Sequence, residues 1–591
     1  MKTFKRISFS IVIIAIILTT LSSSAFGFSL SDSELTAEGK VALLHFNPAL
    51  GDVNANLTAL GNLVNEAFGN GANIVVTPEL STTGYCITRQ QVIDGLGFSS
   101  PYPQLNTIRD LAIKYKGYVV IAFAEVTPEN EVFNVAAVFG PEGFIRTQQK
   151  RTLPLWHNSG ENPFDVIPTP YGDLGVLVCA DSYLPDFSRI LTLKGADIIV
   201  TPANWWGLYD QEQTWQIRAK ENGVWFLVAN RWGYEVDSTY GYVCDMKDAP
   251  SVAISPSGEI LQLYRAMDTA EPKDKILYQT TKVPKYRIGT SINLNYSVIK
   301  RSPGSYGALA NDYYRRDHSY QPVPGLPTPG AIRVASLAYK PSPYSIENIE
   351  KIYSLWENQE CSADIVVAPG LGITQELVRS KNTNWSESPN LIGIQNFVNE
   401  KGISLFVTTV NELSDNGIHQ SLLLVQPGKR PELIQQLHDG ILKKGSGKPP
   451  YTIDLLGARI GILTGHDALF PESVTSLAKS GTDLLLISST AGTEFETNDI
   501  LSMNYYWNIK YLKTLWKVRT NEGLHLAASD WTGNGMIIKN SGFSIEELAE
   551  VNKVNQIATL TLNTANVRSK YLNNYFIFDL DTLISPCNIL N

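Results

Sequence analysis

The chain has 591 residues, of which 43% are hydrophobic and 18% are charged. These proportions are typical of a globular protein and exclude a collagen, a coiled coil or a largely disordered chain. The formal net charge of −9 argues against nucleic-acid binding, which requires a basic face. Because domains usually contain roughly 100–200 residues, and larger α/β folds somewhat more, the length favours two large domains.

The N-terminus predicts a signal peptide over residues 1–27. A basic start is followed by an apolar run at 7–21 and by small residues, with Ala25 and Gly27 placed to suit a signal peptidase. The alternative is a retained membrane anchor, but the run is short for a membrane span of about 20 residues. After cleavage we expect no membrane-spanning segment, and a secreted or periplasmic protein.

Short apolar runs alternate with longer amphipathic stretches along the first half of the chain. The apolar runs predict buried strands, and apolar residues at helical spacing predict a helix at 54–68. The segment that ends in Lys220-Glu-Asn predicts another helix at 212–222. This alternation is typical of a layered α/β fold. The predicted strands are 41–45, 74–76, 119–124, 132–139, 174–178 and 198–201.

Three side chains in this half have catalytic potential. Glu79 and Cys179 each follow an apolar run, and Lys150 follows a turn. Side chains at the ends of such strands can meet at one edge of a sheet. A carboxylate can take a thiol proton, and an ammonium can stabilise a thiolate and an oxyanion. Taken singly, Cys179 is better explained as a buried hydrophobic residue, Glu79 as a turn residue and Lys150 as a surface lysine. Only the combination of the three favours a nucleophilic site.

A stretch rich in Pro and Gly at 301–330 predicts an extended linker that packs over the surface, because prolines disrupt helices and central strands. Beyond it the sequence pattern of the first half recurs. Residues 364–370 resemble 73–79, and residues 460–467 resemble 174–181. The same order at similar spacing predicts a duplicated domain.

Taken together, the motifs of the first half resemble those of the carbon–nitrogen hydrolase (nitrilase) superfamily. Residues 78–85 resemble its glutamate motif, the segment around Lys150 its lysine motif, and residues 171–181 its cysteine motif. Segments 218–222 and 229–233 resemble a later helix and strand of the family.

This resemblance implies two tandem α-β-β-α sandwich domains, of which residues 36–300 form the catalytic one. It also implies a thioester mechanism that acts on a small-molecule amide and needs neither a metal nor an organic cofactor. The implied site contains a general base and acid, an oxyanion-stabilising ammonium, a nucleophile, a backbone N–H donor and a supporting carboxylate, which are Glu79, Lys150, Cys179, Ala180 and Glu161.

Residues 331–591 depart from the pattern where the chemistry would occur. Glycine can supply neither a base nor a thiol, so we expect a degenerate, non-catalytic domain that keeps the fold. We expect this domain to pack on the catalytic one as an internal pseudo-dimer. The corresponding positions are Gly370 for Glu79, Gly465 for Cys179, and Lys443 or Lys444 for Lys150.

Several side chains near the predicted site could line a substrate pocket, although they could equally be core residues. They are Trp156, Asn204, Trp205 and Trp206. The Ala and Asp that follow Cys179 resemble the amidase-type branch of the family more than the true nitrilases.

The chain contains five cysteines. In an oxidising compartment an odd number leaves at least one thiol unpaired. If Cys179 is the free thiol, the other four could form up to two disulfides, and the sequence leaves their connectivity open.

Two alternative functions remain open. The same thioester could transfer an acyl group to an amine, or the chain could be a binding protein built from two retired hydrolase domains. The complete set of Glu79, Lys150 and Cys179 argues against the binding protein, because a retired site would be expected to lose members, as the second half has done.

Overall fold

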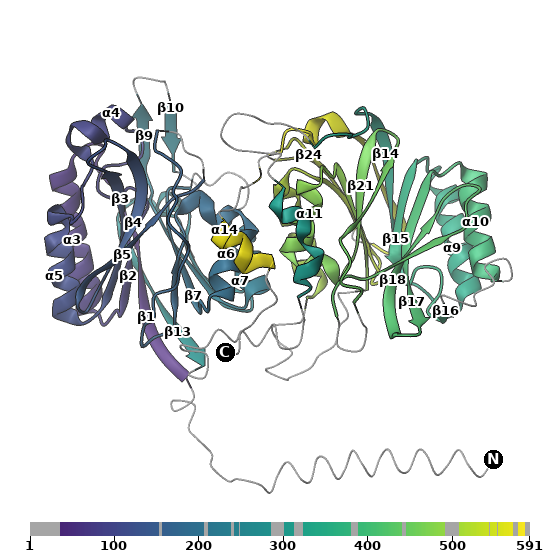
Figure 1. Ribbon diagram of the computed structural model, residues 1–591, viewed down its shortest axis with the longest axis horizontal. Coiled ribbons are helices and arrows are strands. Elements are labelled where there is room, and N and C mark those ends of the chain that lie inside the picture. Colours follow the sequence, from purple (N-terminus) through teal and green to yellow (C-terminus); the bar gives the residue numbers. More distant parts are fainter. Residues whose placement is uncertain are drawn as a thin grey trace, which may run out of the picture.

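A computed structural model shows two α/β halves that lie side by side (Figure 1). The predicted signal peptide, Trp206, Lys443 and Lys444 lie outside the residues that it describes. The described residues are 36–152, 156–205, 211–237, 242–246, 249–284, 301–311, 323–379, 388–439, 445–490, 507–542, 544–551, 553–570, 572 and 577–584.

The first half contains a six-stranded sheet in the order β13-β1-β2-β3-β4-β5. Strands β1, β2 and β3 run parallel, and the other neighbours pair antiparallel. The strands are β1 (Thr36–His45), β2 (Ile74–Val76), β3 (Tyr118–Val126), β4 (Val132–Gly140), β5 (Gly143–Gln149) and β13 (Lys275–Pro284).

A second, five-stranded sheet in the order β12-β11-β8-β7-β6 packs against the first. Its strands are β6 (Leu174–Val176), β7 (Ile198–Ala203), β8 (Trp225–Asn230), β11 (Ser251–Ile254) and β12 (Ile260–Tyr264). A separate ribbon pairs β9 (Tyr234–Asp237) with β10 (Tyr242–Asp245).

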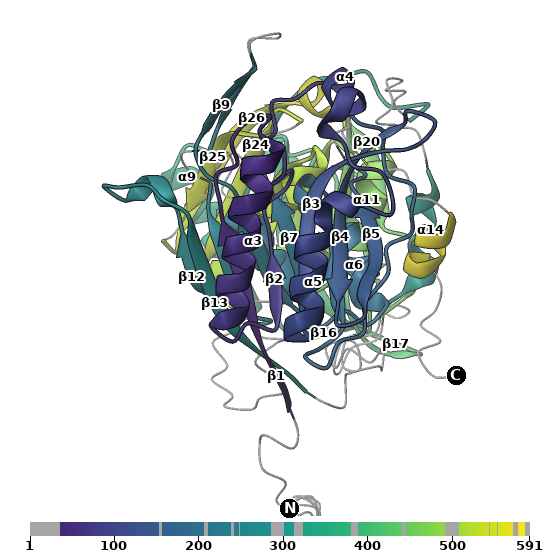
Figure 2. The same cartoon turned by 90° about the vertical axis from the view of Figure 1, so that its left-hand side faces the viewer.

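Helices cover the outer faces of both sheets. Helices α3 (Val53–Gly69) and α5 (Asn106–Tyr115) lie across the first sheet (Figure 2), and α6 (Pro185–Leu193) and α7 (Gln211–Asn222) cover the second. Alternation along a strand supplies both faces: Leu43 contacts the opposite sheet, while its neighbour Leu44 contacts the helices. Apolar residues on both faces explain why these strands read as continuous apolar runs.

The second half also contains two sheets, in the orders β19-β18-β17-β15-β14-β26 and β20-β21-β22-β23-β24-β25. A short strand, β16 (Leu377–Arg379), pairs with β17. The first sheet contains β14 (Ala331–Ala338), β15 (Ile365–Gly370), β17 (Leu405–Ser414), β18 (Gly417–Val425), β19 (Glu432–Gln435) and β26 (Gln556–Asn563). The second sheet contains β20 (Tyr451–Leu455), β21 (Ala458–Thr464), β22 (Leu484–Ser489), β23 (His525–Asp530), β24 (Asn534–Asn540) and β25 (Ile545–Val551).

The helices of this half are arranged in the same way as those of the first. Helices α9 (Ser345–Asn358) and α10 (Pro389–Lys401) cover one sheet, and α11 (Pro471–Lys479) and α13 (Ile509–Arg519) cover the other. The last described helix, α14 (Ile577–Ile584), returns to pack on α6 of the first half.

The two halves meet through α6 and α7 on one side and α11 and α13 on the other (Figure 1). Ile217 of α7 belongs to the hydrophobic core of the second half. Buried charges also cross this boundary, since Arg189 lies 3.2 Å from Glu472 and Arg519 lies 2.8 Å from Glu221. Within the described ranges, no helix has the length and hydropathy needed to cross a membrane.

The predicted strands and helices agree with the structure to within a few residues, but the first part of the predicted linker differs. Residues 301–311 form two short 3-10 helices, Pro303–Ser305 and Gly307–Ala310, and do not run extended over the surface. Tyr306 and Leu309 are fully buried. The Tyr306 hydroxyl hydrogen-bonds His438 Nε2 at 2.7 Å, which explains why an aromatic residue occurs in a stretch otherwise typical of a linker.

Candidate active site

Glu79 lies in the turn that follows β2, and its side chain is fully buried. Its backbone N–H donates to the Ala203 carbonyl at 3.3 Å, which ties the turn to the end of β7. The next residue, Leu80, has a positive φ of 48°, which is uncommon for a branched side chain and marks a constrained turn. The turn therefore fixes the carboxylate between the two sheets.

Lys150 directly follows β5 and reaches the same carboxylate. Its Nζ donates to Glu79 Oε1 at 2.5 Å, and the Asn134 side-chain amide donates to that oxygen at 2.7 Å. The exposed fractions of the Lys150 and Glu79 side chains are 1% and 0%, so water screens this pair very little. The other oxygen of Glu79, Oε2, has no hydrogen-bond partner among the described residues.

Cys179 begins a short 3-10 helix, Cys179–Tyr183, three residues beyond the end of β6. Its φ of 47° lies in the left-handed region, a conformation that costs free energy and is found disproportionately at functional sites. The Ser182 hydroxyl donates to the Cys179 carbonyl at 2.6 Å and accepts from the Trp215 indole at 2.9 Å. These bonds hold the turn on which the sulfur is presented.

The three groups influence one another electrostatically. Burial and the nearby Glu79 carboxylate raise the pKa of the Cys179 thiol, against the opposing effects of Lys150 and the Asn204 backbone N–H. Burial alone would lower the pKa of Lys150, but the charges of Glu79 and Cys179 raise it well above its usual value. At neutral pH the resting site therefore contains a thiol beside a charged ammonium.

Two further residues assemble this site. Asp181 is buried and accepts backbone N–H bonds from Arg151 at 3.2 Å and Thr152 at 2.9 Å, which joins the segment after Lys150 to the cysteine turn. Asn134, on β4, bonds Glu79 from the other side. We did not predict Asn134 because a single amide inside an apolar strand gives no sequence signal, whereas Asp181 stands within the cysteine motif.

Glu161 does not join the other predicted residues. Its side chain is exposed, and only its backbone N–H is anchored, through a 3.0 Å bond to Gln149 Oε1. A buried residue of the same loop is His157, whose pKa is lowered to about 4 by burial and by the charge of Lys150. Because a carbonyl can only accept, His157 Nδ1 donates to the Asn158 carbonyl at 2.8 Å.

The predicted pocket residues lie in mixed surroundings. Asn204 is buried, whereas Trp205 is partly buried and packs against Tyr183 and Trp215, with ring centroids 5.7 and 5.9 Å away. Trp156 is partly buried against a separate apolar cluster. These contacts account for the packing of the rings without requiring a ligand. Ala180, whose backbone N–H is a predicted oxyanion donor, follows Cys179 in the first turn of its short helix.

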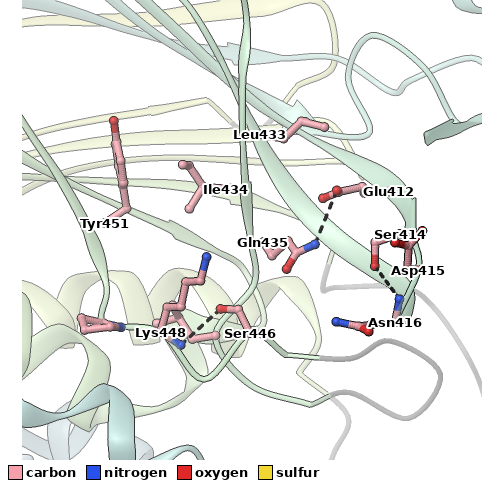
Figure 3. A pocket seen from close by; sticks show the side chains of 12 residues that line it. Glu412, Ser414, Asp415, Asn416, Leu433, Ile434, Gln435, Ser446, Lys448 and Tyr451 are labelled. Carbon is pink, nitrogen blue, oxygen red and sulfur yellow. Dashed lines mark hydrogen bonds between the residues drawn. The ribbon is translucent and has the colours of Figure 1, made fainter. Parts of the chain in front are cut away.

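A pocket of about 610 Å³ lies in the second half and is separate from these residues (Figure 3). Glu412 lines it, but its two carboxylate oxygens already accept bonds from Ser421 at 2.6 Å and Gln435 at 3.4 Å. Neither Cys nor His is among its lining residues. Elsewhere in the described part of the chain, no group of His, Cys, Asp and Glu is arranged to hold a metal ion.

Residues 40–275 match the carbon–nitrogen hydrolase family. The chain is 32% identical over 237 residues to a nitrilase of Pyrococcus abyssi, covering 39% of this chain and 86% of that one. It is 27% identical over 250 residues to a citrullinase of Francisella tularensis, covering 38% and 87%. It is 28% identical over 252 residues to an N-carbamoylputrescine amidase of Solanum lycopersicum, covering 37% and 80%.

Among solved structures, Nit3 of Saccharomyces cerevisiae, a member of the nitrilase superfamily, is 22% identical and aligns with a TM-score of 0.37, covering 43% of this chain and 93% of that one. The match to the Pyrococcus abyssi relative defines the class: this chain belongs to the carbon–nitrogen hydrolase family. The homologous region lies in its first half, which therefore has the nitrilase-like fold of the family.

Proposed function

We propose that the first half is an amidase-type carbon–nitrogen hydrolase, in which Cys179 is the nucleophile, Glu79 the general base and acid, and Lys150 the oxyanion donor. The observation that carries this proposal is the buried contact of Lys150 Nζ with Glu79 Oε1 at 2.5 Å, beside a thiol in a strained turn. A solvated lysine, a turn glutamate and a core cysteine would not need to share one buried site.

In this mechanism the free oxygen of Glu79 takes the Cys179 proton as the sulfur attacks the amide carbon. Negative charge moves to the carbonyl oxygen, where Lys150 and backbone N–H groups at the start of the cysteine turn stabilise it. The C–N bond then breaks, and the amine leaves with the proton held by Glu79. Water, deprotonated by the same carboxylate, hydrolyses the thioester and restores the thiol.

The high pKa of the Cys179 thiol fits this sequence of steps. A resting thiolate would require a charge in a buried site that already contains the Glu79 carboxylate. Proton transfer during the attack avoids two adjacent anions. Because its pKa is raised, Lys150 keeps its proton throughout the cycle, so it acts as a fixed positive charge and not as a base.

The second half is, on this proposal, a degenerate copy of the same fold. Its two sheets follow strand orders that parallel those of the first half, with β14, β15, β17 and β18 in the places of β1, β2, β3 and β4. Leu371, which follows Gly370, has a positive φ of 58°, as Leu80 does after Glu79. The backbone thus repeats the turn while the catalytic side chain is missing.

Backbone contacts also indicate which residue corresponds to Lys150. The N–H of Gln436 donates to the Gln420 carbonyl at 2.8 Å, as that of Lys150 donates to the Asn134 carbonyl at 2.8 Å. By this correspondence a glutamine stands in place of the ammonium. The degenerate half therefore lacks the base, the nucleophile and the charge together.

Space in the degenerate half is also closed. A Cβ added at Gly465 would lie 2.3 Å from Ser489 Oγ, and one added at Gly370 would lie 2.5 Å from the Ser489 carbonyl oxygen. Contacts this short require the neighbour to move. Ser489 at the end of β22 thus occupies the space where a nucleophile and a base would stand. We propose that this half serves as an internal pseudo-dimer partner through the α6, α7, α11 and α13 contact.

We further propose that the chain is exported, with a cleaved signal peptide over residues 1–27, and that its substrate is a small amide or N-carbamoyl compound. The basic and apolar N-terminal pattern supports export. Amidase and citrullinase relatives support the substrate class. N-terminal sequencing of protein recovered outside the cytoplasm should begin at Phe28, and an intact N-terminus on that protein would contradict cleavage.

The decisive experiment combines labelling with turnover. The purified chain is treated with iodoacetamide, and peptide mass spectrometry locates the alkylated cysteines. The same samples are assayed for ammonia release from simple amides, N-carbamoyl compounds and nitriles. We expect loss of activity in proportion to labelling at Cys179, and no turnover by Cys179→Ala with unchanged circular dichroism. Cys361→Ser, which removes a partly exposed thiol in the second half, is the matched control and should stay active. Turnover by Cys179→Ala would refute the assignment.

A further inference from the structure

Two cysteines that the mechanism does not use lie close to the candidate site. Cys86 stands in the loop that begins with Glu79, and Cys244 stands in β10. Their exposed fractions are 9% and 0%, and both belong to one buried cluster that includes Leu80 and Tyr85. Both are thiols in this structure.

Glu235 of β9 brings the two cysteines together. Its Oε2 accepts the backbone N–H groups of Tyr85 and Cys86 at 2.8 and 2.9 Å. In the β9–β10 ribbon, Cys244 is the direct cross-strand partner of Glu235. Side chains of directly opposed residues lie on the same face of a ribbon, so Cys244 points toward the side on which Glu235 holds Cys86. A buried ion pair with Arg231 fixes the Glu235 carboxylate in turn.

The pair is also connected to the nucleophile. The side-chain amide of Asn204 donates to Cys244 Sγ at 3.5 Å. The backbone N–H of the same residue is near enough to the Cys179 thiol to lower its pKa, against the larger effect of burial. Asn204 therefore lies between the paired cysteines and the catalytic sulfur. A covalent change at Cys244 would therefore reach the candidate site through a single intervening residue, Asn204.

We propose that Cys86 and Cys244 form a disulfide that fastens the β9–β10 ribbon to the loop carrying Glu79. The proposal assigns one pair among the open connectivities. Cys361 lies in the second half, against the core beneath α9 and α10, and Cys179 lies near the charged pair of Glu79 and Lys150 in the candidate site. The inference uses the proposed export only as the source of an oxidising compartment, and the bond itself does not depend on catalysis.

Formation of this bond requires an oxidant, and a small-molecule disulfide such as oxidised glutathione can supply the oxidation. Cys86 is the attacking thiol, because it is the more exposed of the two and a hydrogen bond from the Cys244 thiol lowers its pKa. Its thiolate breaks the glutathione S–S bond and forms a mixed disulfide, which releases one reduced glutathione. Cys244 then gives its proton to the released glutathione thiolate, and its own thiolate attacks the Cys86 sulfur and releases the second glutathione.

The consequence is mechanical. The β9–β10 ribbon has two strands and pairs with no other described strand, and an isolated two-stranded ribbon is only marginally stable in water. Tyr234 and Val236 of β9 are exposed, so among the described side chains of this ribbon only the opposite face, with Glu235 and Cys244, holds it against the rest of the protein. A covalent link at Cys244 anchors it to a loop that the buried Glu79 contacts already fix.

The test uses the purified full chain, reduced, freed of reductant and then incubated with oxidised glutathione. After alkylation, we expect peptide mass spectrometry to find Cys86 linked to Cys244, with an intact mass lower by two hydrogens and no retained glutathione. Reduction with dithiothreitol should lower the melting temperature by on the order of 5 °C. Cys361→Ser, as a matched control, should keep both the cross-link and the shift.

Cys86→Ser and Cys244→Ser should lose the cross-link, and dithiothreitol should no longer lower their melting temperatures. If either variant fails to fold, the cross-link and the melting temperatures of the wild-type chain decide the proposal by themselves. Persistent glutathione on Cys86, a cross-link to Cys179 or Cys361, or an unchanged melting temperature on reduction would overturn the proposal. Amide turnover is measured on the same samples. An inactive chain that still forms the cross-link would refute the proposed function and leave this inference intact.

Discussion

The buried pair of Lys150 and Glu79 allows stability and catalysis to be separated in one experiment. Each charge has the other as its main partner in a site that excludes water, with Asn134 as the additional donor to the carboxylate. Removing one member of such a pair leaves an unpaired buried charge, which costs about 3–5 kcal/mol of folding free energy. Glu79→Gln and Lys150→Met should each lose stability on this scale.

The double variant should behave differently. With both charges gone, neither is left uncompensated, and replacement of a whole buried pair is often close to neutral. We therefore expect Glu79→Gln/Lys150→Met to be more stable than either single variant by about 2 kcal/mol or more. All three should lose amide turnover by about 10²-fold or more, because a general base contributes about 10²–10⁴-fold and an oxyanion donor about 10²–10³-fold.

Urea unfolding followed by circular dichroism gives the three free energies, and ammonia release gives the rates. Glu161→Gln is the control, since its side chain is exposed, and it should match wild type in both assays. Strictly additive losses in the double variant would refute the coupling on which the mechanism depends.

Three further predictions concern the rest of the chain. Gly465→Cys in a Cys179→Ala background should give no amide turnover. It should also lower the free energy of unfolding in urea by about 1–3 kcal/mol, because the new side chain meets Ser489. Recovered activity would contradict the proposal that Ser489 fills this space. Burial lowers the pKa of His525 to about 4, so between about pH 6.5 and 4 only the unfolded chain takes up a proton at this residue. The free energy of unfolding should therefore decrease as the pH falls through this window. His525→Gln should make that decrease smaller, and an unchanged pH dependence of the free energy of unfolding would be contrary evidence. Although burial opposes it, Arg189 and Arg301 lower the pKa of Glu472 to about 2; Glu472→Gln should cost about 3–5 kcal/mol, and an unaltered melting temperature would contradict this.

The sequence predicted those parts of the fold that depend on local apolar pattern. The strand at 74–76 agrees with β2, and the helix at 54–68 differs from α3 by one residue at each end. The predicted strand 174–178 is too long, because β6 ends at Val176 and the chain then turns toward the left-handed conformation of Cys179. A change of backbone direction leaves no mark in hydropathy.

The candidate site was predictable only in part, for a similar reason. Glu79, Lys150 and Cys179 stand in recognisable motifs, and the structure brings them together. Asn134 does not, because an amide within β4 gains its role from a contact with a residue far away in sequence. Glu161 was assigned from its resemblance to a second glutamate that follows the lysine motif, and such a resemblance does not determine which side chain of a loop turns inward.

The position of Ile217 has a practical consequence for dissecting this protein. This side chain belongs to the first half by sequence, yet it packs in the core of the second. A fragment that ends near residue 300 would leave Ile217 uncovered and would leave Glu221 without Arg519. The sequence boundary between the two halves is therefore not a boundary between independently folding units, and activity should be sought in the intact chain.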